Sequence, residues 1–275
     1  MILIDNNQIM IACIFQAMKN NETEMSVFRH LVLNSYRMYR KRFHKEYGEL
    51  VICNDTKNYW RKDIFPDYKL NRKNKMKKSS IDWDHAFSML NSLMKELEEV
   101  LPYKIVQVDR TEADDVIAIL SRVSLDEKVM IVSSDKDFQQ LLKYPNVNQY
   151  SPFKKEFIVC DDPERFLIEH IIRGDYSDGI PNILSDDDAI INEEKRQTPC
   201  RSKKIEEIFQ NLGEWSQKEE WKRNQTLIDL DFIPEQYESA ILEAYQKEPK
   251  GKRSKLLNYF IEHRLKNLME YIEEF

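Results

Sequence analysis

The sequence has 275 residues, of which 41% are hydrophobic and 33% charged, so it can bury a sizeable core and stay soluble. No stretch reaches the roughly 18 apolar residues of a membrane span, and no signal peptide opens the chain. The four cysteines are widely spaced without a C-x-x-C pair, so neither a zinc ribbon nor a disulfide framework is indicated. These features favour a reducing, intracellular setting. The net charge of -6 by itself speaks against a nucleic-acid partner, but the distribution of charge matters more than its sum.

Strand and helix signals alternate in chain order. Apolar runs typical of buried parallel strands occupy residues 1–5, 48–55, 103–109 and 128–134. Helical spacing of apolar residues follows at 24–45, 82–101 and 111–123. In the first of these helices Val27, Leu31, Leu33 and Met38 are predicted to form the apolar face. Thr111 is predicted to be the N-cap of the third helix.

The second half of the chain changes character. A helix is expected to begin near Phe138, residues 148–150 and 156–160 indicate a small hairpin, and residues 162 to 275 indicate helices with short loops. The alternation predicts an α/β fold with a central, mostly parallel sheet flanked by helices and an all-helical C-terminal part. The expected domains are residues 1–160 and 161–275.

Acidic side chains gather where the predicted strands end. In a parallel α/β sheet the functional site lies beyond the carboxyl ends of the strands. Nine carboxylates from five segments fall at or near that edge: Asp5, Asp55, Glu112, Asp114, Asp115, Asp135, Asp137, Asp175 and Asp178. Converging carboxylates cannot all stay ionised cheaply unless cations neutralise them. Oxygen-only ligands select Mg²⁺ or Mn²⁺, and this number of ligands predicts two ions acting on a phosphodiester.

Each motif alone has a simpler reading. The Asp-x-Asp at 135–137 could cap a helix, and the "EADD" of 112–115 could simply place acidic side chains in the first turn of a helix. Asp175 and Asp178 could cap a helix near Gly174 and Gly179. These readings do not explain why all the motifs arrive in order at successive strand ends.

Basic residues are concentrated in two stretches. Residues 61–78 hold eight Lys and Arg against two Asp, and residues 195–204 hold five with no acid. Tyr59, Trp60 and Tyr68 are interleaved with the first stretch, and this pattern predicts stacking and charge for a single nucleic-acid strand. A solvated face or flexible loop is the simpler alternative.

These motifs resemble, in order, those of the 5′-nuclease (flap endonuclease) family, which shares a PIN-like core. The matching stretches are Asp5, "ND" at 54–55, "EADD", "SSDKDF" at 133–138 and "GDYSDGIPN" at 174–182, while "YKLNR" at 68–72 resembles the family's Y-K-x-x-R in a helical arch. Further stretches, such as "RHLVLNS" at 29–35 and "LIDLDFIP" at 227–234, resemble the T-even phage ribonuclease H branch of that family.

The resemblance implies roles for individual residues. Asp5, Asp55, Glu112, Asp114 and Asp135 would hold the first metal ion, directly or through water. Asp135, Asp137, Asp175 and Asp178 would hold or support the second, with Asp115 in the outer part of the cluster. Lys69 and Arg72 would reach the scissile phosphate from an arch segment at about residues 59–82. The basic residues that would contact nucleic acid are Arg61, Lys69, Arg72, Lys73, Arg196, Arg201, Lys203 and Lys204.

The resemblance also implies an activity. The chain would be a Mg²⁺-dependent 5′→3′ nuclease (ribonuclease H, 5′ exonuclease and flap endonuclease) that removes RNA primers and flaps during lagging-strand phage replication. Its substrates would be RNA–DNA hybrids, 5′ flaps and duplex DNA, gripped by a helix–hairpin–helix-like element in residues 161–275. It would be a cytoplasmic monomer in the infected bacterium, with a single-stranded-DNA-binding protein and a sliding clamp as candidate partners.

Three alternatives stay open on the residues. A PIN-type single-strand ribonuclease shares the carboxylate cluster, but its domain is shorter and lacks the arch and the helical tail. An aspartyl phosphatase would place its Asp-x-Asp on the first strand, where this chain has only Asp5. A DNA-binding protein without cleavage would gain nothing from nine carboxylates beside phosphate.

Overall fold

A computed structural model describes residues 1–19 and 24–275, and the chain forms two compact units. The first unit contains Met1–Thr56, Asp82–Val159 and Glu235–Phe275, and the second contains Lys57–Ile81 and Cys160–Pro234. The expected boundary near residue 160 is also where the chain enters the second unit. Residues 57–81 were expected in the first domain but pack in the second unit. Residues 235–275 were expected in the second domain but pack in the first unit.

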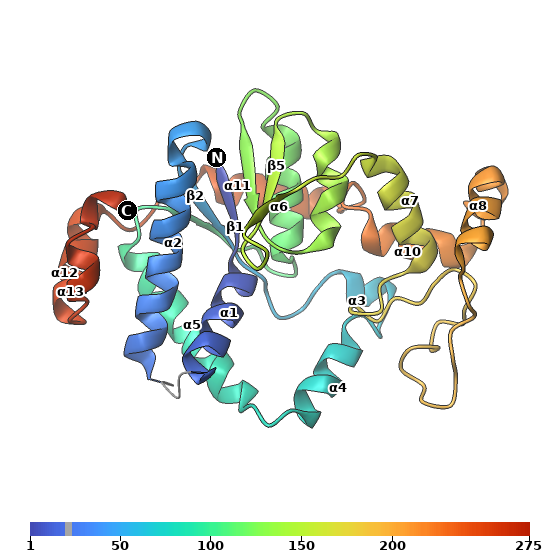
Figure 1. The fold of residues 1–275 in the computed structure, drawn as a ribbon, viewed down its shortest axis with the longest axis horizontal. Helices are drawn as coiled ribbons and strands as arrows, with labels where there is room; N and C mark the ends of the chain where they lie inside the picture. Colours follow the sequence, from blue (N-terminus) through green and yellow to red (C-terminus); the bar gives the residue numbers. More distant parts are fainter. Residues whose placement is uncertain (20–23) are drawn as a thin grey trace. The chain divides into compact units, whose positions relative to one another are not determined.

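A six-stranded sheet forms the centre of the first unit (Figure 1). Its strands are β1 (Ile2–Asp5), β2 (Leu50–Cys53), β3 (Lys104–Val106), β4 (Val129–Val132), β5 (Val147–Ser151) and β6 (Glu156–Ile158), in the spatial order β3-β2-β1-β4-β5-β6. All neighbouring pairs are parallel except β5 with β6, which form the predicted antiparallel hairpin. The mostly parallel α/β sheet predicted from the alternating pattern is therefore confirmed.

The strand order reverses direction at β1. The chain adds β2 and β3 on one side of β1 and then β4 and β5 on the other, so the reversal falls between β1 and β4. In open α/β sheets, ligands bind at such a switch point, outside the carboxyl ends of the strands. Asp5 ends β1, and Asp135 follows β4 by three residues.

Helices surround this sheet in the first unit. They are α1 (Asn6–Lys19), α2 (Met25–Tyr47), α5 (Trp83–Val100), α6 (Ala113–Val123), the 3₁₀ helix η1 (Lys136–Lys143), α11 (Glu235–Gln246), α12 (Arg253–Glu262), α13 (Lys266–Met269) and the 3₁₀ helix η2 (Ile272–Glu274). Helix α1, which was not predicted, packs alongside α2 (Figure 1). One core joins strands β1, β2 and β4 to α1, α2, α5, α12 and Phe275.

The second unit is helical. It consists of α3 (Arg61–Ile64), α4 (Leu70–Lys78), α7 (Pro163–Arg173), α8 (Ser202–Gln210), α9 (Leu212–Trp215) and α10 (Glu219–Ile228). Its core includes Phe65, Tyr68, Ile172, Ile208 and Trp221, and α7 packs against α10. The prediction of short loops after residue 162 is wrong for residues 174–201, which form no helix because polar turns replace helical spacing there.

Two exclusions can be checked in the described residues. All four cysteines are free thiols, as their spacing indicated. In the part of the chain that the structure describes, every helix is too short or too polar to cross a bilayer.

Candidate active site

Asp5 lies at the centre of the carboxylate group in the first unit. It ends the buried strand β1 and is itself only 7% exposed. Its carboxylate accepts hydrogen bonds from the Ser133 hydroxyl at 2.7 Å and from the Gln8 N–H at 3.3 Å, the latter closing the first turn of α1. The pKa of Asp5 is raised to about 7, with burial as the largest cause. The hydrogen bond from Ser133 lowers this pKa, and the charges of Asp55 and Asp135 raise it.

Asp55 follows strand β2 and is oriented by two donors. Its carboxylate accepts hydrogen bonds from the Asn7 amide and from the Ala113 N–H, the latter at 2.7 Å. Since Ala113 is the first residue of α6, Asp55 interacts with the positive N-terminus of that helix. This contact connects the carboxyl end of β2 to the "EADD" segment.

Asp135 and Asp137 follow strand β4. Asp135 is the N-cap of η1 and accepts a hydrogen bond from the Asp137 N–H at 3.0 Å. The helix expected from Phe138 is therefore a 3₁₀ helix that begins at Lys136, directly after this cap. The Gln149 amide donates to the Asp135 carbonyl at 2.6 Å and fixes the backbone. Asp135 thus caps η1, and its charge helps to raise the pKa of Asp5.

The "EADD" segment begins α6. Glu112 is the N-cap, and it forms a reciprocal capping box with Asp115, whose carboxylate accepts the Glu112 N–H at 3.0 Å. The prediction that Thr111 is the cap is wrong, because its hydroxyl donates instead to the Val108 carbonyl. Asp114 is half-buried, and its charge, together with that of Asp5, adds to burial in raising the pKa of Cys53.

The donor set in the first unit fits a divalent cation. Asp5 carries a pKa of about 7 because burial and two further carboxylates oppose its ionisation. A hard cation with oxygen ligands would remove that opposition, which is the chemistry of Mg²⁺ and Mn²⁺ and not of zinc. The charges of Asp55 and Asp135 both act on Asp5, so these two carboxylates lie near it. Their role as ligands stays a prediction.

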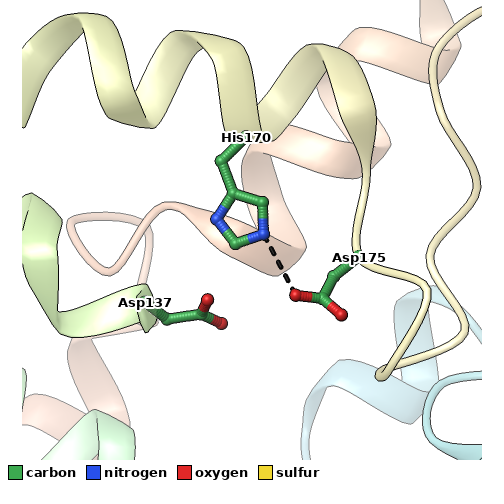
Figure 2. Close-up of side chains that lie close together, drawn as sticks. All are labelled: Asp137, His170 and Asp175. Atoms are coloured by element: carbon green, nitrogen blue, oxygen red, sulfur yellow. Dashed lines mark hydrogen bonds and ion pairs between the residues drawn. The ribbon is translucent and has the colours of Figure 1, made fainter. Parts of the chain in front are cut away.

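Asp175 in the second unit closes a turn. One carboxylate oxygen accepts hydrogen bonds from the Ser177 N–H and hydroxyl, at 2.7 and 2.6 Å, and from the Asp178 N–H at 3.2 Å. The other lies 3.1 Å from His170 Nε2, the contact drawn in Figure 2. Both side chains of this pair are almost completely buried. The alternative that Asp175 caps a helix near Gly174 and Gly179 is wrong, because residues 174–201 form no helix and Asp175 closes a turn instead. The predicted metal role of Asp175 stays a prediction.

Asp178 contacts the arch segment. Its carboxylate accepts a hydrogen bond from the Tyr68 hydroxyl at 3.2 Å, lies 3.6 Å from the Lys69 ammonium and forms an ion pair with Arg72. Lys69 and Arg72 were expected to reach for a phosphate, and in this structure both contact Asp178. The side chain of Asp178 is 9% exposed.

Three of the residues expected to face nucleic acid are buried. Arg61 is 2% exposed and donates to the Leu227 carbonyl at 3.0 Å, so we correct its role from nucleic-acid contact to packing. Trp60 and Tyr68 are each 3% exposed and cannot stack on a strand in this state. Tyr68 instead packs in the core of the second unit.

The remaining predicted nucleic-acid contacts are accessible. Lys73, Arg196, Arg201 and Lys203 are exposed, and Lys204 is half-buried. The acidic 186–188 loop is neutralised locally, since Lys195 pairs with Asp186 and Asp188 at 3.1 and 2.7 Å. Arg223 pairs with Asp187.

Several residues that support the site were not predicted. Ser133 and His170 contact the carboxylates of Asp5 and Asp175, and a lone serine or histidine gives no sequence signal of this kind. Asn6 donates to the Asn54 side chain at 2.6 Å, which connects the ends of β1 and β2. The sequence signal available for Asn6 and Asn54 was that each is a polar residue directly after an apolar strand. For Asn6, that signal was used only to predict where the first strand ends.

Family models match both parts of the chain. The 5′-3′ exonuclease N-terminal resolvase-like domain matches residues 1–168, and the model described as T4 RNase H, C terminal, matches residues 162–275. Ribonuclease H of Enterobacteria phage T4 is 34% identical over 99% of this chain and 95% of its own length. Flap endonuclease Xni of Shewanella pealeana is 29% identical over 61% of this chain and 65% of its own length.

Solved structures share the fold at lower identity. The phage T5 5′-exonuclease with bound zinc superposes with a TM-score of 0.61 at 21% identity, covering 90% of this chain and 99% of that one. The phage T5 flap endonuclease in a complex with DNA and metal ions gives a TM-score of 0.62 at 21% identity, with the same coverage. With both family models matched and a relative that aligns along nearly its whole length, this chain belongs to the 5′-3′ exonuclease family of nucleases, together with T4 ribonuclease H.

Proposed function

We propose that the chain is a Mg²⁺-dependent 5′→3′ nuclease that cleaves RNA–DNA hybrids, 5′ flaps and duplex DNA ends. The observation that carries this proposal is the buried Asp5 at the switch point of the sheet. Burial and the charges of Asp55 and Asp135 raise the pKa of Asp5 to about 7. Such a group is costly for a protein that only binds phosphate, whereas a metal-dependent hydrolase requires it. The names of the relatives, ribonuclease H and flap endonuclease, support the substrate classes.

Two ions are the proposed cofactors, with Mn²⁺ able to replace Mg²⁺. The proposed ligands in the first unit, direct or through water, are Asp5, Asp55, Glu112, Asp114, Asp135 and Asp137, with Asp115 outside them. Asp175 and Asp178 are the proposed ligands in the second unit. Bound ions would polarise the phosphodiester, lower the pKa of the attacking water and neutralise the leaving 3′-oxygen.

The protein's own side chains orient these ligands and the substrate. Ser133 and the Ala113 N–H fix the carboxylates of Asp5 and Asp55, so little reorganisation is needed when cations bind. Lys69 and Arg72 would add positive charge to the phosphate oxygens. Lys73, Arg196, Arg201, Lys203 and Lys204 would contact the duplex backbone and give the affinity its salt dependence.

The biological role that fits these substrates is removal of RNA primers and 5′ flaps during lagging-strand phage replication. A monomer acting in the cytoplasm of an infected bacterium would meet a single-stranded-DNA-binding protein and a sliding clamp there. The phage origin of the 34% identical relative supports this setting.

Product lengths on defined substrates test the activity. A 5′-labelled RNA–DNA hybrid, a 5′-flap DNA and a single-stranded RNA are incubated with the protein in Mg²⁺ and in EDTA. Short 5′ products from the hybrid and flap, formed only in Mg²⁺, are expected. Cleavage of single-stranded RNA alone would support a PIN-type ribonuclease, and binding without any product would support a structure-specific binding protein.

A further inference from the structure

The turn that carries Asp178 is fastened to the beginning of helix α4. The Lys69 N–H donates to the Asp178 carbonyl at 2.7 Å, and the Arg72 guanidinium donates to the Ser177 carbonyl at 3.1 Å. The Asn71 amide donates to the Tyr176 carbonyl. Gly179 lies so close that an added Cβ would be 3.1 Å from the Asp67 carbonyl. These hydrogen bonds to the backbone of the turn set the distance between α4 and the turn, so they determine which groups the Asp178 side chain contacts.

The Asp178 carboxylate is shared by two cations and a hydroxyl. Arg72 pairs with one oxygen, while Tyr68 and Lys69 approach the other at 3.2 and 3.6 Å. The side chains of Lys69 and Asp178 are only 12% and 9% exposed, so water competes weakly for this pair. A buried charge whose partner is removed is strongly destabilised, which makes each member of this group dependent on the others.

The backbone of Lys69 is also unusual. Lys69 has a φ of 60° in the left-handed region, which a residue with a Cβ adopts rarely and at a cost. Its N–H and its ammonium group both contact Asp178, and these contacts fix the residue in this conformation. The position of the Lys69 ammonium group therefore depends on Asp178.

We propose that Asp178 is the common partner in an ion exchange that couples phosphate binding to divalent-cation binding. In the free protein Asp178 neutralises Lys69 and Arg72. A phosphodiester that engages the two cations releases the carboxylate for a divalent ion, and an ion bound by the carboxylate releases the cations for phosphate. This deepens the proposed function and depends on Lys69, Arg72 and Asp178 having the roles given there.

The proposed exchange predicts the direction in which metal affinity changes when Lys69 or Arg72 is replaced. A carboxylate that binds metal without exchanging partners predicts no such change. Removing a cation removes a competitor, so loss of Arg72 or Lys69 should strengthen binding of a divalent ion to the protein without nucleic acid. Coupling free energies of this kind correspond to changes of about five-fold or more in affinity. A ligand carboxylate that does not exchange would be insensitive to Arg72, and an ion pair with no role in metal binding would leave metal affinity unchanged.

The first experiment is a Mn²⁺ titration of the full chain without nucleic acid, followed by the electron paramagnetic resonance signal of free Mn²⁺. Arg72→Gln and Lys69→Met should each strengthen the weaker phase of Mn²⁺ binding by about five-fold or more. Lys77→Gln is the matched control, because it removes a positive charge from an exposed position of the same helix and should change Mn²⁺ affinity less than two-fold, or about 0.4 kcal/mol by RT ln 2. Thermal unfolding of each variant establishes that it is folded.

A double-mutant cycle isolates Asp178. Asp178→Asn should weaken the same phase of Mn²⁺ binding, and adding Arg72→Gln to it should then give no increase. In EDTA, Asp178→Asn should also strengthen binding of a 5′-flap DNA, measured by fluorescence anisotropy, because both cations lose one carboxylate that competes with phosphate. Unchanged Mn²⁺ affinity in Arg72→Gln, or an increase that persists beside Asp178→Asn, would overturn the exchange. Neither result would disturb the proposed nuclease function, which metal-dependent cleavage by the wild-type protein tests separately.

Discussion

Asp5 combines three roles in one side chain. It ends β1, its carboxylate accepts the Gln8 N–H in the first turn of α1, and it carries a pKa of about 7 in the company of Asp55 and Asp135. The Ser133 hydrogen bond favours the ionised form, while burial and the neighbouring charges oppose it. The position was predictable from the sequence, because carboxyl ends of parallel strands share one edge. The contact with Ser133 was not, because it joins residues 128 positions apart.

Replacing Asp135 should separate function from stability. Asp135→Asn should abolish metal-dependent cleavage, yet its side-chain oxygen can still accept the Asp137 N–H, so the cap of η1 should survive. Losing one charge near Asp5 should raise the stability of the metal-free protein at pH 7 by roughly 1 kcal/mol. Thermal unfolding in EDTA and in Mg²⁺, beside a flap-cleavage assay, measures both effects. Ser133→Ala is the opposite control and should lower stability in EDTA, since it removes the donor that favours ionised Asp5.

Asp5 should also produce a pH dependence. Its pKa rises from 3.8 to about 7 on folding, so between these values the unfolded chain releases a proton that the folded protein keeps. The free energy of unfolding in EDTA should therefore fall as pH rises through this window and level off above it. At about 1.4 kcal/mol per pKa unit, this shift corresponds to about 4 kcal/mol for Asp5. Urea unfolding between pH 4 and 8 should show this fall in wild type and less of it in Asp5→Asn; equal slopes would contradict the assignment.

At the scale of elements, the strands were easier to predict than the helices around them. Apolar runs specify buried parallel strands with little ambiguity, and all four predicted runs contain a strand. The apolar face of α2 was predicted only in part. Leu33 is buried and Leu31 packs against the core, as predicted, whereas Met38 is 54% exposed. The buried Phe28, Val32 and Tyr36 were not predicted. Helix α1 was missed because Asn6, which begins it, is polar and serves the site through Asn54.

The capping box of α6 can be distinguished from a metal role. Asp115 is fully buried and accepts the Glu112 N–H, so Asp115→Ala should lower the free energy of unfolding by about 1–2 kcal/mol. Asp115→Asn keeps an acceptor at the same place and should cost less. Asp114→Ala, outside the box, serves as the comparison, and all three are measured by urea unfolding in EDTA. If Asp115→Ala proved as stable as wild type, the box would not be holding the helix end.

At the scale of the whole molecule, residues far apart in sequence complete each core. Phe275 is fully buried, packs with its ring centroid 5.2 Å from that of Phe260, and its carbonyl accepts a hydrogen bond from Arg253 at 2.8 Å. Glu274 pairs with Arg37 and Lys41 of α2 at 2.6 Å each. The sequence did not predict that residues 235–275 pack in the first unit, because an amphipathic helical pattern does not specify which core the helix joins.

Truncating this contact should destabilise the first unit. Phe275→Ala should lower the free energy of unfolding by about 3–5 kcal/mol, as expected for a large aromatic ring removed from a core. Tyr271→Ala is the matched control: it is 42% exposed, stacks on the Arg37 guanidinium and should cost less than about 1 kcal/mol. Chemical denaturation followed by circular dichroism measures both. Similar losses in the two variants would mean that Phe275 is not part of the cooperative core.

The interleaving of the two units has a consequence for how the protein is made. A ribosome releases the chain from residue 1 onward, yet the core of the first unit includes Leu256, Phe260 and Phe275. Domains usually fold as they emerge, but this unit has to wait while the intervening residues 160–234 are synthesised. The second unit, completed at Pro234, can gather its own core first. We therefore expect the carboxylate group around Asp5 to be assembled last, so that a partly synthesised chain has no complete metal site and no activity against nucleic acid near the ribosome.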